Sequence, residues 1–271
     1  MNNENKVTEN TSMVRSISVT FQLLDTMVRA GEPMRITEIA RQMGESKAKV
    51  HRHLSTLRSL GVVEQEKTSE KYRLGWKLFK LGQAAFEQFD LKAIAEPHMA
   101  RLRDLTGQSA VLAVASGGEA VVISSMDSSG STSLKISAVP GTVPPLTASA
   151  QGRIVLAYSS DDYKNEVLSK NIKSYNDKSI TDVDEIKARL DNIKNRLYET
   201  AIEEVMLGFS TIAAPILDAD NNLIGTVGII GSVQFIADPP TPQQIAHVQS
   251  CASTISATFA SRAYKGVADP F

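Results

Sequence analysis

Basic and short polar side chains gather on one side of a segment between Ser46 and Leu60 that can form a helix. Val50, Leu54 and Leu57 recur at helical spacing within it, so one face of this helix is expected to be buried. The opposite face and its flanks carry Lys, Arg, His, Ser, Thr and Ala side chains. Lys and Arg donate to guanine or phosphate, Ser and Thr contact either, and Ala can touch a thymine methyl. The segment therefore predicts contact with the major groove of DNA.

The charge of the surrounding sequence favours this interpretation. Residues 35–61 hold six basic and two acidic side chains, an excess of four positive charges. The alternative is a structural helix pair whose charged face is only solvated, and a basic stripe on a nearly neutral protein argues against it. The predicted DNA-binding residues are Arg35, Thr37, Ser46, Lys47, Ala48, Lys49, His51, Arg52, Lys71 and Arg73.

Three predicted helices position this surface. A first helix is expected over residues 14–30, and Thr37 can cap a second one. Gly44 supplies the tight turn into the third helix, which Ser46 caps and which stops before Gly61. Two short strands are expected to follow, over residues 62–66 and 71–74 around a turn at 67–70. This order is that of a winged helix-turn-helix domain.

The remainder of the chain is expected to form a second, α+β domain around an antiparallel sheet. Its first helix would be interrupted or kinked at Pro97, and Thr147 would cap a later one. Further helices are expected over 161–170, 182–198 and 243–264, and strands over 109–115, 120–125, 133–139, 209–217 and 223–230. The predicted ranges are a disordered tail at 1–13, the winged helix-turn-helix domain at 14–75, a linker helix at 76–90 and the second domain at 91–271.

Composition limits the partners of each part. The 271 residues, 42% of them hydrophobic, can supply two cores. The net charge is −1, but residues 1–90 carry 14 basic and 11 acidic side chains, so only the N-terminal third suits a polyanion. A lone cysteine, a polar start and the lack of any apolar run of about 20 residues predict a cytoplasmic protein with no membrane partner.

The other reactive residues suggest neither catalysis nor a cofactor. His51 and His53 lie about 200° apart on one helix and His98 and His247 are isolated, so no metal site is expected, and His53 is interpreted as a packed side chain. Cys251 is interpreted as a small buried hydrophobe. The acidic pairs Asp161-Asp162 and Glu203-Glu204 are interpreted as helix-start and loop charges, and the glycines at 225, 228 and 231 as strand positions that leave space for backbone or ligand.

With both halves considered, the chain resembles the IclR family of bacterial transcriptional regulators. The resemblance rests on EIARQMG, KVHRHLSTLRSLGVVEQ and EKYRLGWKLFKLG in the first half, and on VPPLTASAQGRIVLA and EEVMLGFSTIAAPILDADNNLIGTVGIIG in the second. It implies a homodimer or dimer of dimers whose second domain is GAF-like and binds a small metabolite. Trp76, Phe79 and Leu81 are candidates for part of the dimer contact, with packing inside one chain as the alternative.

The resemblance also implies the effector-binding positions. They are Ser133, Ile136, Thr147, Ala150, Gln151, Ala201, Thr211, Gly228 and Ile230. Relatives that bind small polar acids tend to have an acid, a cysteine and two serines at the last four of these positions. This site is therefore expected to take a ligand with one carboxylate or carbonyl and an apolar body, which would fill space that Gly228 opens beside Ile230.

These inferences predict a transcriptional repressor that a metabolite controls and that governs a neighbouring catabolic operon. Two other classes stay open: an enzyme with an appended DNA-binding domain, and an architectural protein that binds DNA without a small ligand. A cluster of catalytic groups in the second domain would favour the enzyme. A site too small or too filled for a metabolite would favour the architectural protein.

Overall fold

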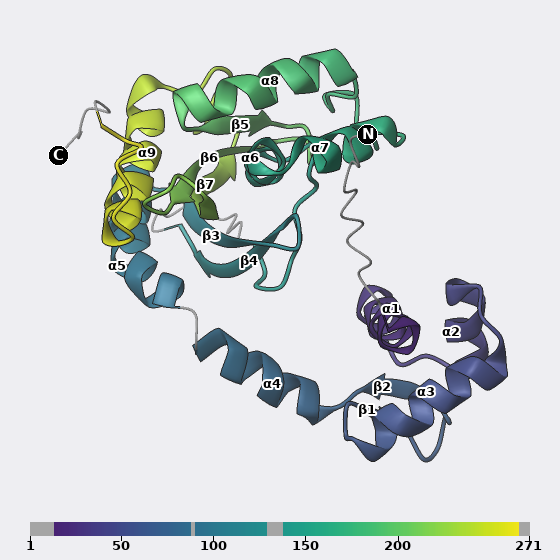
Figure 1. Ribbon diagram of the computed structural model, residues 1–271. Coiled ribbons are helices and arrows are strands. Elements are labelled where there is room, and N and C mark those ends of the chain that lie inside the picture. The colour runs from purple at the N-terminus through teal and green to yellow at the C-terminus, as the bar shows by residue number, and fades with distance from the viewer. Residues whose placement is uncertain (1–13, 88–89, 129–137, 266–271) are drawn as a thin grey trace, which may run out of the picture. The chain divides into compact units, whose positions relative to one another are not determined.

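The structure is a computed structural model that describes residues 14–87, 90–128 and 138–265. The chain divides into two compact units, Met1–Phe89 and Asp90–Phe271 (Figure 1). Each unit is described by itself.

The first unit is a three-helix domain with a hairpin and a following helix. Its elements are α1 Arg15–Ala30, α2 Ile36–Met43, α3 Lys47–Ser59, β1 Val63–Gln65, β2 Tyr72–Leu74 and α4 Trp76–Glu87. The strands pair antiparallel, and the register joins Val63 to Leu74 and Gln65 to Tyr72. This order confirms the winged helix-turn-helix that the sequence predicted.

Apolar faces at helical spacing build the core of this unit. Leu23 of α1, Ile39 of α2 and Leu54 of α3 are completely buried in one cluster. Gly44 takes a left-handed φ of 64° between α2 and α3, a conformation that glycine adopts without steric cost. The Ser46 hydroxyl accepts a hydrogen bond from the N–H of Lys49 at 3.3 Å, which confirms the predicted cap of α3.

The predicted cap of α2 is wrong. The helix starts at Ile36, and Arg35 is its N-cap residue, so Thr37 lies inside the first turn. The N–H of Arg35 donates to Glu38 Oε2 at 2.7 Å, which satisfies a group that has no partner within the helix. Glutamate at the third helical position therefore bonds the N–H of the N-cap residue, which is one of the two contacts of a capping box.

The second unit is an α+β domain. Its elements are α5 Asp90–Thr106, β3 Ser109–Ser116, β4 Glu119–Met126, α6 Ala150–Tyr158, α7 Asp161–Ser169, α8 Val183–Arg196, β5 Glu199–Ile202, β6 Phe209–Leu217, β7 Leu223–Ser232 and α9 Pro242–Thr258. The five strands form one antiparallel sheet in the order β4-β3-β7-β6-β5. The predicted fold class is confirmed.

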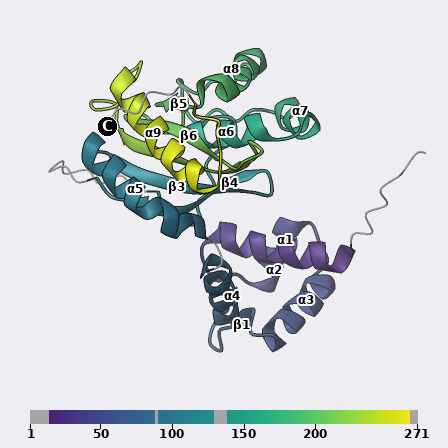
Figure 2. The ribbon, with the colours of Figure 1, turned by 60° about the vertical axis from the view of Figure 1, so that its left-hand side comes forward.

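Helices cover both faces of this sheet. Helices α5 and α9 pack on one face, and α6 packs on the other with α8 outside it (Figure 2). Ile212, Val227 and Ile229 face α5 and α9 in the largest core cluster. Because side chains alternate along a strand, the neighbouring residues Thr211, Gly228 and Ile230 lie on the α6 side.

Some element boundaries differ from prediction. Strand β5 was not predicted, because it is only four residues long and follows directly after α8. Helix α5 is not interrupted at Pro97, since that proline is exposed and the carbonyl that loses its N–H partner can face water. The final helix ends at Thr258 rather than at residue 264. Of the predicted strand 133–139, residues 133–137 lie outside the described part, and Ala138 and Val139 are in no strand.

Candidate nucleic-acid interface and effector site

The solvent face of α3 is the basic surface that the sequence predicted. Lys47, Ala48, His51 and Arg52 are exposed, and the buried residues of this helix lie on its opposite side. Lys49 differs from them, because its ammonium group lies 2.5 Å from Glu45 Oε1 in a half-buried ion pair. Lys49 therefore has an intramolecular partner that DNA would have to replace.

Other predicted DNA-binding residues lie at the start of α2 and at the hairpin. Arg35 and Thr37 are exposed at the start of α2, and Lys71 is half-buried beside the hairpin. Arg73 is exposed on β2, but its guanidinium pairs with Glu64 across the hairpin at 2.8 Å. The positive charge of Arg73 on the hairpin is thus already partly balanced by Glu64.

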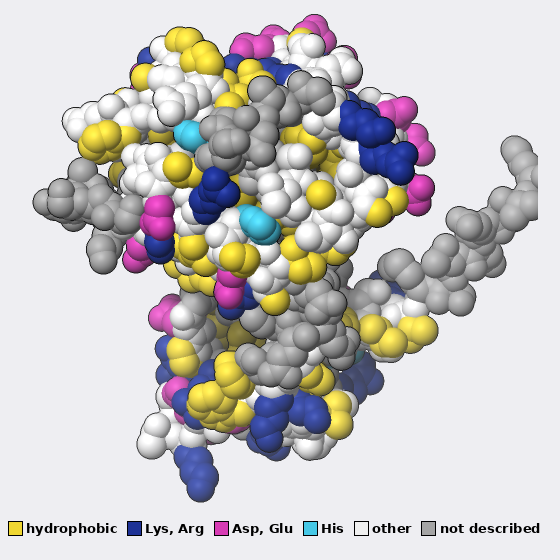
Figure 3. Space-filling view, turned by 90° about the vertical axis from the view of Figure 1, so that its left-hand side faces the viewer, with side chains coloured by type: hydrophobic (Ala, Val, Ile, Leu, Met, Phe, Trp, Pro, Cys, Tyr) yellow, Lys and Arg dark blue, Asp and Glu magenta, His cyan; other side chains and the backbone are white. Residues whose placement is uncertain are grey.

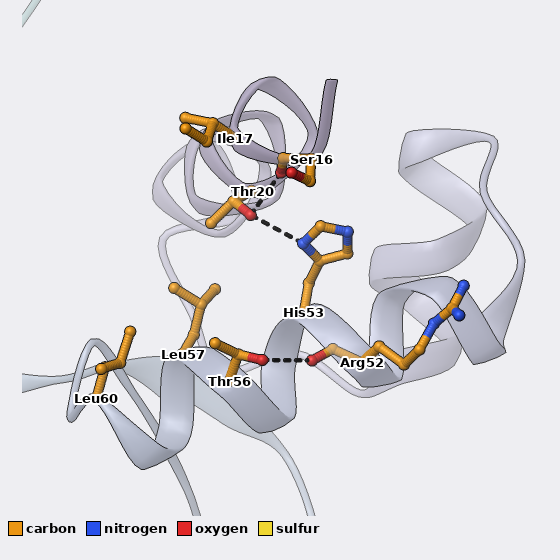
Figure 4. A pocket seen from close by; sticks show the side chains of 8 residues that line it. All are labelled: Ser16, Ile17, Thr20, Arg52, His53, Thr56, Leu57 and Leu60. Atoms are coloured by element: carbon orange, nitrogen blue, oxygen red, sulfur yellow. Dashed lines mark hydrogen bonds between the residues drawn. The ribbon is translucent and has the colours of Figure 1, made fainter. Parts of the chain in front are cut away.

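A groove separates the start of α1 from the side of α3 (Figure 4). It encloses about 380 Å³ and is lined by Ser16, Ile17, Thr20, Arg52, His53, Thr56, Leu57 and Leu60. His53 Nδ1 lies 2.8 Å from Thr20 Oγ1, while the Thr56 hydroxyl donates to the Arg52 carbonyl of its own helix at 3.2 Å. His53, which the sequence analysis interpreted as a packed side chain, is half-buried, lines this groove and bonds to Thr20 of α1.

The first unit also exposes large apolar side chains. Ile17 and Phe21 of α1 are 56% and 62% exposed, and Trp76 and Phe79 of α4 are 69% and 62% exposed. The two aromatic rings of α4 meet edge to face, with centroids 5.9 Å apart. Leu81 is exposed as well. Within the described residues, packing inside one chain therefore does not cover these side chains.

Several predicted effector-binding residues meet on the α6 side of the sheet. The strand register places Ala201, Thr211 and Ile230 in one row across β5, β6 and β7. Ala150, the first residue of α6, is buried in the same cluster as Ala201. Thr211 and Ile230 are only half-buried, so this row has an accessible part.

A tight turn leads into α6 on the same side of the sheet as this row. Its N-cap residue is Ser149, so the predicted cap at Thr147 is wrong. The Ser149 hydroxyl accepts from the N–H of Gly152 at 2.9 Å and donates to the Pro145 carbonyl at 2.7 Å. A Cβ at Gly152 would lie 2.1 Å from that same carbonyl oxygen, so only glycine permits this approach. Gln151 is half-buried at the turn.

Gly228 does not open space for a ligand. A Cβ built there would lie 2.2 Å from the carbonyl oxygen of Ile212 and 2.8 Å from the Cα of Ala213. The neighbouring strand fills this volume, so the expected space beside Ile230 is not at Gly228. The other two predicted positions, Ser133 and Ile136, lie outside the described residues.

Sequence reasoning missed a buried ionic cluster beside the turn. Arg153 is 0% exposed, and its guanidinium makes a bidentate contact with Glu204, at 2.7 and 2.8 Å. Burial by itself lowers the pKa of Arg153, but the hydrogen bond to Glu204 and the charges of Glu199 and Glu204 outweigh it, so the pKa is raised. Glu204 is therefore no loop charge in solvent. The available signal was an arginine within the otherwise apolar run GRIVLA.

The other face of the domain brings together residues that were considered isolated. His98, Arg101, His247 and Cys251 line a small groove of about 110 Å³ between α5 and α9. Figure 3 shows this side of the unit, where hydrophobic and uncharged side chains predominate and two histidines reach the surface. No group of three potential His, Cys, Asp or Glu metal ligands occurs among the described residues. Cys251 is buried, as predicted, and burial raises its pKa to about 12.

Comparison with known proteins matches both units. The family models described as "IclR helix-turn-helix domain" and "Bacterial transcriptional regulator IclR C-terminal" match residues 16–67 and 83–257. The chain is 28% identical over 248 residues to the glycerol operon regulatory protein of Streptomyces coelicolor. This match covers 90% of this chain and 95% of that relative.

Solved structures share the fold. A crystal structure of an IclR transcriptional regulator from Alicyclobacillus acidocaldarius has a TM-score of 0.74 and 25% identity, and covers 90% of this chain and 98% of that one. An IclR homologue from Microbacterium hydrocarbonoxydans, crystallised with 4-hydroxybenzoate, has a TM-score of 0.70 and 21% identity, and covers 90% of this chain and 99% of that one.

Among the described residues, no helix is both long and apolar enough to cross a bilayer.

Proposed function

The chain belongs to the IclR family of bacterial transcriptional regulators, and we propose that it represses a neighbouring catabolic operon under the control of a small metabolite. In this proposal the protein has no enzymatic activity, and it acts in the cytoplasm, where bacterial DNA lies. The observation that carries the proposal is the pairing of an exposed basic α3 with a second unit whose α6 turn faces the half-buried Thr211 and Ile230.

The proposed DNA contact is the solvent face of α3. Lys47, His51 and Arg52 can reach base edges or phosphates there, and Ala48 permits close approach. The hairpin would lie along the backbone next to it, with Lys71 and Arg73 as phosphate donors. One such helix reads few base pairs, so a specific operator requires two half-sites.

The proposed assembly is therefore a homodimer or a dimer of dimers. Ile17, Phe21, Trp76 and Phe79 support it, because exposed apolar side chains of this size are favourable to bury against a second copy. A symmetric pair would set the spacing of the two recognition helices.

The proposed effector site lies between the turn at residues 147–151 and the row of Thr211 and Ile230. The first N–H groups of a helix lack partners within it and attract a carboxylate or carbonyl oxygen. The Thr211 hydroxyl lies 3.5 Å from the Ala201 carbonyl, a long contact that leaves it able to bond a ligand. The rest of the row is apolar, which favours a ligand with one polar end and an apolar body.

A ligand screen coupled to DNA binding tests this function. Monocarboxylates and carbonyl compounds with apolar bodies would be tested by thermal shift, with 4-hydroxybenzoate among them. At 100 times its dissociation constant, a true effector should stabilise the protein by about 2.7 kcal/mol. The same compound should change the affinity for the intergenic DNA beside the protein's own gene in a gel-shift titration.

A matched pair of variants locates the site. Thr211→Val should weaken the ligand response, because it removes the one hydroxyl of the row. Thr226→Val, on the same side of the sheet but buried, is the control. Equal responses in both variants, or DNA binding that no compound alters, would contradict the proposal.

A further inference from the structure

A buried ionic contact joins Arg153 to Glu204 next to the proposed effector site. The side chains of Arg153 and Glu204 are 0% and 4% exposed. Two parallel contacts join them: Nη1 lies 2.7 Å from Glu204 Oε2, and Nη2 lies 2.8 Å from Oε1. Such a bidentate pair fixes both the direction and the plane of the guanidinium.

The same guanidinium also holds two backbone carbonyls. Nη1 donates to the Thr147 carbonyl at 2.9 Å, and Nη2 donates to the Thr200 carbonyl at 2.5 Å. Thr147 begins the turn before α6, and Thr200 directly precedes Ala201 in β5. One side chain thus joins the turn to the strand at the edge of the row formed by Ala201, Thr211 and Ile230.

The two glutamates of the cluster are held differently. Glu199 lies 3.3 Å from Arg153 Nε and also pairs with the half-buried Arg189 and Arg196. In the described part of the chain, the carboxylate of Glu204 pairs with Arg153 alone. Neutralising Glu204 would therefore release one side of the guanidinium without leaving Glu199 unpaired.

Stability alone is a weak explanation for such a cluster. Well-packed apolar residues of similar volume often stabilise a core at least as well as a buried ion pair. A buried ion pair can instead favour one arrangement of the chain over others, and here the bonded groups are the two carbonyls that border the proposed site.

We infer that Arg153 and Glu204 form a positioning pair that sets the separation between the α6 turn and β5, and so prepares the effector site without touching the ligand. This inference rests on the proposed function for the identity of the site. The geometry of the pair itself does not depend on that function.

Hydrogen exchange measured on the full-length protein tests the pair. Glu204→Gln keeps the size of the side chain and removes its charge. It should accelerate amide exchange at residues 147–153 at least tenfold, while β6 and β7 exchange as in the parent. Glu203→Gln is the matched control, since Glu203 bonds the N–H of Gly208 and lies outside the pair. Uniform acceleration over the whole unit, or no change at the turn, would overturn the inference.

A second variant covers the case in which Glu204→Gln does not fold. Arg153→Lys retains the positive charge for Glu204, but one ammonium group cannot replace the fork that reaches both Thr147 and Thr200. It should show the same local acceleration at the turn. Normal exchange at the turn in a folded Arg153→Lys protein would overturn the inference.

A binding measurement separates this inference from the proposed function. With 4-hydroxybenzoate as the probe, Glu204→Gln should weaken binding at least tenfold, and Glu203→Gln should not. If neither the parent nor any variant binds the probe, 4-hydroxybenzoate is excluded as an effector, while the exchange data still decide the positioning role. Equal affinities of Glu204→Gln and the parent would overturn that role.

Discussion

His53 Nδ1 lies 2.8 Å from Thr20 Oγ1, and this contact joins α3 to α1 across an open groove (Figure 4). The Thr20 hydroxyl is also 2.8 Å from the Ser16 carbonyl of its own helix. When the hydroxyl donates its single proton to Ser16, Nδ1 must be the donor to Thr20. The orientation of α3 therefore depends on a polar contact as well as on the apolar core.

Thr20→Val should weaken DNA binding several-fold, on the order of 1 kcal/mol, because it removes the partner of His53 and lets α3 shift. Gel-shift titration measures the change. Thr56→Val is the control, since Thr56 lines the same groove but bonds only within α3. The same loss of affinity in both variants would show that the contact between the two helices is unimportant.

Arg52→Ala should cost about 1–3 kcal/mol at the cognate operator if its guanidinium reads a base. Lys49→Ala should weaken binding to all DNA sequences similarly, and its effect should be small because Glu45 already holds this ammonium group. Titrations at two salt concentrations distinguish the two roles. Unchanged operator affinity in both variants would place the DNA-binding surface elsewhere.

Light scattering at micromolar concentration should give the mass of a dimer or a dimer of dimers. Phe79→Glu should lower that mass, because it places a charge among the exposed apolar side chains of α4. Phe235→Glu is the control, since Phe235 is an exposed aromatic residue of the second unit. A monomeric parent that still binds its operator tightly would contradict the proposed assembly.

Acid should destabilise the second unit through His247. Burial lowers the pKa of this imidazole below its usual 6.5, so below pH 6.5 the unfolded chain binds more protons than the folded one. The free energy of unfolding should therefore fall as the pH falls from 6.5 to the lowered value in the folded protein. Melting temperatures at pH 7.5 and 5.5 measure this effect. A melting temperature difference that His247→Gln leaves unchanged would assign the acid sensitivity to other groups.

Local patterns predicted the first unit well. The stripe of Val50, Leu54 and Leu57, the turn at Gly44 and the cap at Ser46 all depend on residues within a few positions of one another. Thr37 and Thr147 were wrong as caps because the choice between neighbouring residues depends on where the helix starts, and tertiary packing decides that.

The second unit shows where sequence reasoning stops. Arg153 meets Glu199 and Glu204 only because β5 folds back beside α6, and the spacing of 46 and 51 residues carries no local signal. Gly228 was correctly placed in a strand, but a glycine that admits a ligand and one that admits a neighbouring backbone have the same sequence pattern.

Among the described residues, strand β5 is one of the two edges of the five-stranded sheet, and an edge strand is a place where another polypeptide can add. The Thr200 carbonyl of this strand already accepts a hydrogen bond from Arg153. A foreign strand that approached β5 would have to displace a buried guanidinium to use this acceptor. At this one position, the ionic cluster therefore competes with any added strand for the Thr200 carbonyl.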